Sequence, residues 1–167
     1  MNKNLDCEIY SELARQLRYE DDRLSQRKML HTRILKLSAK KSHYSSVEIG
    51  NVLLESEQFQ KSIIQFKRAI IIEPNNSYAQ VSLAEAFLKL NKENEAFSYL
   101  RRALCLCPGS YSAHYVVVGR FQDQKRLEDI DSFYQEIANL LTDTKSIADL
   151  YFGSAESLVG SNQYSKA

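Results

Sequence analysis

The chain has 167 residues, with 22 Lys and Arg against 21 Asp and Glu, so its formal net charge is +1. This balance excludes attraction of nucleic acid by bulk positive charge, and 44% hydrophobic against 26% charged residues excludes a wholly disordered chain. Five Gly and two Pro favour helices over a turn-rich β-sandwich, and three Cys make no disulfide framework. A cytoplasmic protein is therefore expected.

Residues 1–42 are expected to form a helical hairpin that is either a degenerate repeat or a cap. They carry 10 Lys and Arg against 6 Asp and Glu, and the basic residues lie mostly on its second helix. A basic helix can bind phosphates or an anionic membrane surface, but a solvated charged face is the commoner meaning. We therefore expect neither nucleic acid nor membrane as the main partner. The basic residues of this helix are Arg23, Arg27, Lys28, Arg33, Lys36, Lys40 and Lys41.

The sequence then repeats itself at an offset of 34 residues, the separation of Pro74 and Pro108. At this offset large residues meet large residues and small ones meet small ones, which is the mark of a helical repeat protein. The matching pairs are Tyr44 and Tyr78, Val47 and Val81, Ile49 and Leu83, Gly50 and Ala84, Leu53 and Phe87, Leu54 and Leu88, Ser62 and Ala96, Phe66 and Leu100, and Ala69 and Ala103.

Each unit is predicted to contain two amphipathic helices. In 43–76 the polar stretch 55–58 carries the turn, and Pro74 ends the second helix because proline cannot continue it. Asn75, Asn76 and Ser77 can then cap the next helix. The unit 77–110 repeats this plan, with Asn91 in its turn. Small residues such as Gly50 and Ala84 allow the two helices of a hairpin to approach closely.

Two weaker units follow. Residues 111–147 are predicted to be a degenerate repeat whose two helices fit in registers that differ by one residue. Residues 148–167 match the first helix of a further repeat, with the second helix starting near Asn162. We interpret this last unit as a partial, truncated repeat.

The pattern resembles the tetratricopeptide repeat (TPR) family. Ile49-Gly50, Leu53, Phe66, Ala69 and Pro74 match its signature in one unit, and Leu83-Ala84, Phe87, Ala96, Leu100, Ala103 and Pro108 match it in the next. The usual Trp of the first helix is replaced by Ser46 and Gln80. The resemblance implies an all-α, right-handed superhelix (solenoid) of antiparallel helix–turn–helix hairpins.

In that family the first helix of each repeat lines a concave groove that binds a peptide or helix. The resemblance therefore implies a peptide-binding groove in this chain. Its lining would be Tyr44, Val47, Glu48, Asn51, Leu54, Glu55, Tyr78, Val81, Ser82, Glu85, Leu88, Lys89 and Tyr115. Ser112, Val116 and either Gly119 or Arg120 would extend it, depending on the register of the third unit.

The expected partner is a protein or peptide with apolar anchors and a basic residue, because the groove is mildly apolar with Glu48, Glu55 and Glu85 at its edges. Some family members clamp the C-terminal carboxylate of chaperone tails with Lys, Arg and Asn at fixed positions. Only Asn51 agrees with that set, so a chaperone tail is not expected. The leading interpretation is a non-catalytic scaffold. The alternatives are a substrate-recruiting arm of a larger enzyme, such as a glycosyl- or sulfotransferase, and self-association through exposed end repeats.

No catalytic motif, metal site or cofactor is expected. The chain lacks a phosphate-binding loop, a nucleophile elbow and a metalloprotease helix. His31, His43 and His114 are far apart in the sequence, and a solvated or capping role is expected for the last two. Cys105 and Cys107 are spaced by one residue rather than two, and a second ligand pair is missing.

Overall fold

The computed structural model describes Met29 and residues 43–164, and within this part of the chain every regular element is a helix. The chain divides into two compact units, one up to Asn75 and one from Asn76 onward. The predicted hairpin over 1–42 and its basic helix lie outside the described residues, apart from Met29.

The first unit contributes one antiparallel hairpin. Helix α3 (His43–Glu55) turns through Ser56 and Glu57 into α4 (Phe59–Ile72), and the two helices pack along their length. Helix α4 buries Ser62, Ile63, Phe66 and Ala69 while exposing Ile64 and Ile71, as its amphipathic pattern predicts.

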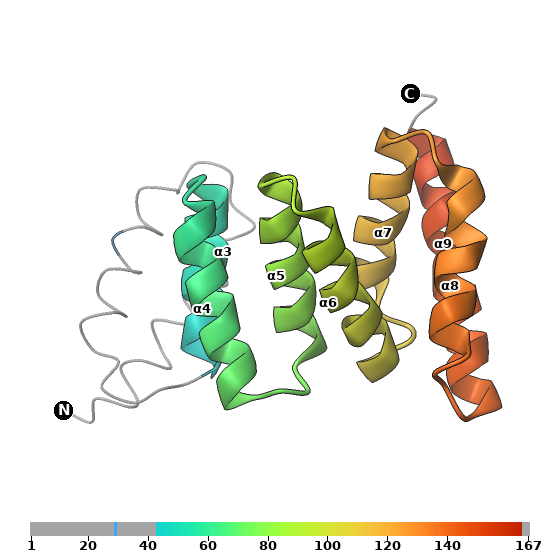
Figure 1. Ribbon diagram of the computed structural model, residues 1–167, viewed down its shortest axis with the longest axis horizontal. Helices are drawn as coiled ribbons and strands as arrows, with labels where there is room; N and C mark the ends of the chain where they lie inside the picture. The colour runs from blue at the N-terminus through green and yellow to red at the C-terminus, as the bar shows by residue number, and fades with distance from the viewer. Residues whose placement is uncertain (1–28, 30–42, 165–167) are drawn as a thin grey trace. The chain divides into compact units, whose positions relative to one another are not determined.

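The second unit contains the remaining helices, which follow one another in chain order (Figure 1). They are α5 (Ser77–Lys89), α6 (Glu93–Leu106), α7 (Tyr111–Asp123), a short 3-10 helix η2 (Leu127–Asp129) that continues into α8 (Ile130–Ala138), and α9 (Thr144–Tyr164). Helix α7 packs against both α5 and α9, while α6 packs against α8. The second unit is therefore two layers of helices, α5–α7–α9 and α6–α8.

The turn inside each hairpin has the same structure at intervals of 34 residues. Glu57, Asn91 and Lys125 are the only non-glycine residues with positive φ in the described part of the chain, at 58°, 58° and 56°. The residue after each of them donates its backbone N–H to a carbonyl five residues earlier, as in Lys92 to Phe87 and Arg126 to Phe121. This is the Schellman arrangement, which satisfies carbonyls at a helix end. The first two turns lie where the sequence placed them, at 55–58 and at Asn91, but their left-handed conformation was not predicted because glycine usually takes that position.

Small residues control the close approach of helices, as predicted. A Cβ atom at Gly50 of α3 would lie 2.4 Å from Cε1 of the fully buried Phe66 on α4. In the next hairpin Ala84 and Leu100 occupy the equivalent positions, and both are fully buried. The larger aromatic ring is thus paired with glycine, and the smaller leucine with alanine.

The prediction that the two helices of the third hairpin differ in register by one residue is wrong. Lys125 follows Asn91 by 34 residues, and the buried residues Ile130, Tyr134 and Ile137 follow Ala96, Leu100 and Ala103 by the same offset. Gly119 lies one residue after the position that Gly50 and Ala84 occupy in the first two hairpins, which makes the first helix match the signature one residue late. The buried residue at that position is Val118.

Helix α9 also differs from expectation, because it runs without a break to Tyr164. A new helix was expected near Asn162, but no proline or left-handed residue interrupts the described helix there.

The beginnings of two helices follow the capping rules. Asn76 Oδ1 accepts the backbone N–H of Ala79 at 2.9 Å, and Asp143 Oδ1 accepts that of Ser146 at 2.7 Å. The division into repeats stays a prediction.

Candidate functional site

The predicted groove residues of α3 lie at very different depths. Tyr44 is 36% exposed and Glu55 is exposed, whereas Leu54 is half-buried. Val47, Glu48 and Asn51 are buried. Tyr44 and Glu55 therefore offer most of the accessible surface among the α3 residues assigned to the groove.

The predicted residues of the second unit divide in the same way. Tyr78 of α5 is 41% exposed and Tyr115 of α7 is 59% exposed. Lys89 is exposed, and Glu85 and Leu88 are half-buried. Val81 and Ser82, on the same helix as Tyr78, are buried. Because the hairpins share one 34-residue register, the residue equivalent to Glu85 in the third hairpin is Gly119 rather than Arg120.

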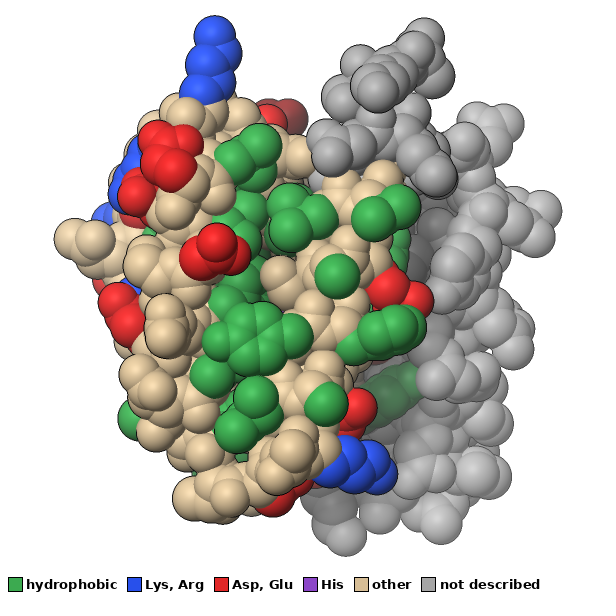
Figure 2. All heavy atoms as spheres, turned by 90° about the vertical axis from the view of Figure 1, so that its right-hand side faces the viewer, with side chains coloured by type: hydrophobic (Ala, Val, Ile, Leu, Met, Phe, Trp, Pro, Cys, Tyr) green, Lys and Arg blue, Asp and Glu red, His purple; other side chains and the backbone are tan. Residues whose placement is uncertain are grey.

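Aromatic side chains dominate the exposed apolar surface of the second unit. Tyr111 and Tyr115, one turn apart on α7, stack with ring centroids 6.2 Å apart. Helix α9 exposes Tyr151, Phe152 and Val159. Figure 2 views the end of the molecule that carries α8 and α9, and shows hydrophobic side chains gathered with acidic ones among them.

Between α7 and α9 lies an open groove of about 740 Å³, which we name the α9 groove. It is mainly apolar, and among the described residues that line it Glu156 is the only charged one. The lining is Tyr111, Phe152, Ala155, Glu156, Val159 and Gly160. A surface of this kind can take up an apolar side chain and offer one carboxylate beside it.

A second hollow, of about 410 Å³, is polar and lies between α6 and α8. Its charges are paired within the protein: Arg101 with Glu136 at 2.8 Å and Arg126 with Asp129 at 2.6 Å. The guanidinium of Arg101 also lies 5.0 Å from the ring centroid of Phe133. The first pair connects α6 to α8 across the hollow, while the second lies within the short segment that leads into α8.

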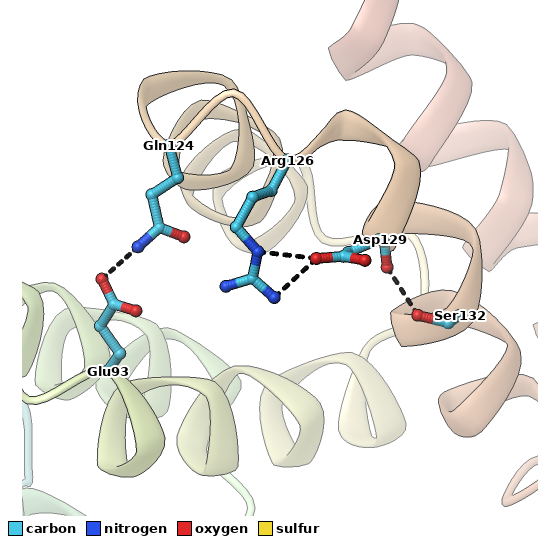
Figure 3. A network of polar contacts seen from close by, with 5 residues as sticks. All are labelled: Glu93, Gln124, Arg126, Asp129 and Ser132. Carbon is cyan, nitrogen blue, oxygen red and sulfur yellow. Dashed lines mark hydrogen bonds and ion pairs between the residues drawn. The ribbon is translucent and has the colours of Figure 1, made fainter.

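Glu93 connects α6 to the end of α7. Its carboxylate accepts hydrogen bonds from the Gln124 amide (Figure 3) and from the Arg120 guanidinium. Both hydrogen bonds lower the pKa of the Glu93 carboxyl, and the bond from Gln124 has the larger effect. Farther along, Ser132 Oγ donates to the Asp129 carbonyl at 2.8 Å.

The expectation that His114 is solvated is wrong, because its side chain is fully buried between α7 and α9. Nε2 lies 2.7 Å from the Pro108 carbonyl, which can only accept, so Nε2 carries a proton. In the neutral ring Nδ1 then accepts from the Tyr134 hydroxyl at 2.9 Å. Burial lowers the pKa of His114, and the bond to Pro108 opposes this. Burial also raises the pKa of Tyr134, and a hydrogen bond with Ser154 opposes this. Two neutral groups enclosed in this way form a structural network.

Within the described residues no cluster of three or more His, Cys, Asp or Glu side chains could hold a metal ion. Cys105 is half-buried and Cys107 is exposed, and both thiols are free. Burial raises the pKa of the Cys105 thiol, which disfavours the thiolate that a metal site or a nucleophile requires. None of the helices described is both long and apolar enough to cross a membrane.

Antiparallel hairpins with buried small residues at a 34-residue interval define an all-α fold of the tetratricopeptide type. No family model matches the chain, and no curated protein matches it.

Solved structures share the fold at low sequence identity. A crystal structure of MamA superposes with a TM-score of 0.61 at 11% identity, covering 96% of this chain and 81% of that one. MamA residues 41 to the end from Desulfovibrio magneticus RS-1 give 0.63 at 16% identity, covering 80% of this chain and 75% of that one. YrrB, described as a TPR protein with an unusual peptide-binding site, gives 0.56 at 19% identity, covering 92% of this chain and 76% of that one. At these identities the likeness shows the fold alone.

Sequence reasoning missed the part of the surface formed by α9 and by Tyr111. A signal was present, because α9 has apolar residues on two faces. Leu150, Gly153 and Ser157 are buried on the inner one, and Phe152, Ala155 and Val159 are exposed on the outer one. Because residues 148–167 were matched only to the first helix of a further repeat, no residue of α9 was assigned to the predicted groove.

Proposed function

We propose that this chain is a non-catalytic scaffold that binds a segment of a partner protein on the first helices of its hairpins. The observation that carries the proposal is the exposure of tyrosines on the first helices of the second unit, Tyr78 on α5 and Tyr115 on α7. In the first unit Tyr44 of α3 is exposed as well. Tyrosine provides a large, rigid contact area with a polar tip and is enriched in binding hot spots.

The chemistry of the described residues supports binding over catalysis. The buried His114 is enclosed, and the charges of the hollow between α6 and α8 are paired within the protein. The fold is shared with YrrB, which is described as a TPR protein with an unusual peptide-binding site. The residues predicted for the groove that are exposed or half-buried are Tyr44, Leu54 and Glu55 in the first unit, and Tyr78, Glu85, Leu88, Lys89 and Tyr115 in the second.

The test is to select peptides from a displayed random library on the immobilised chain. Their affinities are then measured for the wild type, for Tyr78→Ala and for Tyr115→Ala. Each substitution is expected to weaken binding about tenfold, as for a hot-spot aromatic residue. Ile71→Ala is the matched control, because Ile71 is 80% exposed on the second helix of a hairpin. Equal affinities for all four proteins would contradict the proposal.

A further inference from the structure

The outer face of α9 carries a repeating order of acidic and apolar residues. Asp149, Phe152, Glu156 and Val159 follow one another at spacings of three, four and three residues, which places them on one stripe of the helix. All four are exposed, Phe152 at 66% and Val159 at 60%. The buried residues of α9, Leu150, Gly153, Ser154 and Ser157, lie on a different face of the helix.

Tyr111 of α7 lines the α9 groove together with residues of this stripe. It approaches Phe152 and Glu156 from α7, it is 62% exposed, and its ring stacks with Tyr115. Tyrosine faces attract Lys and Arg, and a carboxylate beside them adds direct charge attraction. None of the described residues that line the groove is basic. Lys145, the basic residue within α9, precedes Glu156 by 11 residues, which is about 16 Å along a helix.

From this arrangement we propose that the α9 groove binds a partner segment in which an apolar anchor lies close to a Lys or Arg. The anchor occupies the space between Phe152, Ala155 and Val159. The cation lies against Glu156 and the Tyr111 ring. This proposal rests on the proposed function and names the chemistry of the partner.

The probe is a set of fluorescein-labelled peptides with one Leu or Phe anchor and one Lys at varied spacing. Matched peptides carry norleucine or Glu in place of the Lys. Binding is measured by fluorescence anisotropy at low and at high salt. We expect Lys peptides to bind better than Glu peptides, with a preference that shrinks as salt screens the charge.

Variants of the full chain locate the site. Phe152→Ala is expected to weaken Lys peptides about tenfold. Glu156→Gln is expected to weaken Lys peptides about threefold and to leave norleucine peptides unchanged. The matched controls are Tyr151→Ala, which removes an exposed α9 aromatic outside the groove, and Glu95→Gln, which removes an exposed carboxylate from α6.

The outcomes separate this inference from the proposed function. If peptides bind and Tyr78→Ala weakens them while Phe152→Ala does not, the inference is overturned and the scaffold proposal stands. Failure of every peptide, including those selected from the random library, overturns both. A preference for Glu peptides overturns the inference. So does a concentration-dependent dimer in sedimentation that Phe152→Ala abolishes, because the occupant of the groove is then a second copy of the chain.

Discussion

Gly50→Ala should destabilise the α3–α4 hairpin, and Phe66→Leu should relieve the damage. The added Cβ would lie 2.4, 2.6 and 2.8 Å from three atoms of the Phe66 ring, where carbon atoms normally stay about 3.5 Å or more apart. Phe66 is fully buried, so its ring cannot move into solvent. Overpacking of this kind costs about 3 kcal/mol at the upper end of its usual range. Replacing Gly with Ala inside a helix returns about 1 kcal/mol. The expected net loss is about 2 kcal/mol in the free energy of unfolding.

The second hairpin shows how the clash can be removed. Ala84 and Leu100 stand at the same two positions and pack without exposed surface. Phe66→Leu alone should cost about 1 kcal/mol, because it leaves a cavity beside Gly50. In the Phe66→Leu background, Gly50→Ala should be neutral or stabilising. The coupling energy between the two substitutions is therefore expected to be about 2 kcal/mol.

The four proteins of this cycle are compared by urea unfolding followed by far-UV circular dichroism. Gly119→Ala is the control, because a Cβ at Gly119 meets no atom within 4 Å. That substitution should stabilise the chain by up to about 1 kcal/mol through helix propensity alone. A coupling energy below about 0.5 kcal/mol would refute the reasoning, since independent sites add within that margin.

Three further substitutions test the turns, the buried histidine and a helix cap. Lys125→Gly should raise the free energy of unfolding by about 0.5–1 kcal/mol, because a left-handed conformation costs a side-chain-bearing residue more than glycine; an unchanged urea midpoint would contradict this. Burial holds the pKa of His114 below its ordinary 6.5, so the folded protein disfavours protonation. Stability should thus fall as pH drops below about 6.5, and the slope of the urea midpoint against pH should be smaller in His114→Gln; equal slopes would exclude the histidine as its source. Asn76→Ala removes the side chain that accepts the Ala79 N–H and should cost about 1 kcal/mol by the same assay; a cost near zero would show that the cap is dispensable.

Much of the fold could be predicted from residue spacing. Pro74, Pro108 and the small residues Gly50 and Ala84 recur at one interval, and the helix pairs α3–α4 and α5–α6 lie where this interval places them. Helical periodicity and the exclusion of proline from helix interiors are local rules, so a sequence reveals them directly.

The third hairpin and the candidate site were harder to predict from the sequence. At the 34-residue offset Val118 stands where the second hairpin has the small residue Ala84, and Tyr134 stands where it has Leu100. The third hairpin therefore matches the signature poorly in its true register. The hydrogen bond between Tyr134 and His114 shows how this hairpin accommodates the larger ring. A bond across 20 residues has no local signal. The depth of a groove residue is equally non-local, as the buried Val81 and the exposed Tyr78 on one helix show.

The sequence by itself determined that the described chain is helical, where the hairpins α3–α4 and α5–α6 turn and which small residues they bury, because these features depend on neighbours along the chain. Only the tertiary structure decided which side chains remain exposed. It enclosed His114 between α7 and α9 against Gly153, and it left Tyr111 beside Phe152 and Glu156 in an open groove. Exposure depends on which helices pack on which faces, and that is settled by contacts between residues far apart in the sequence.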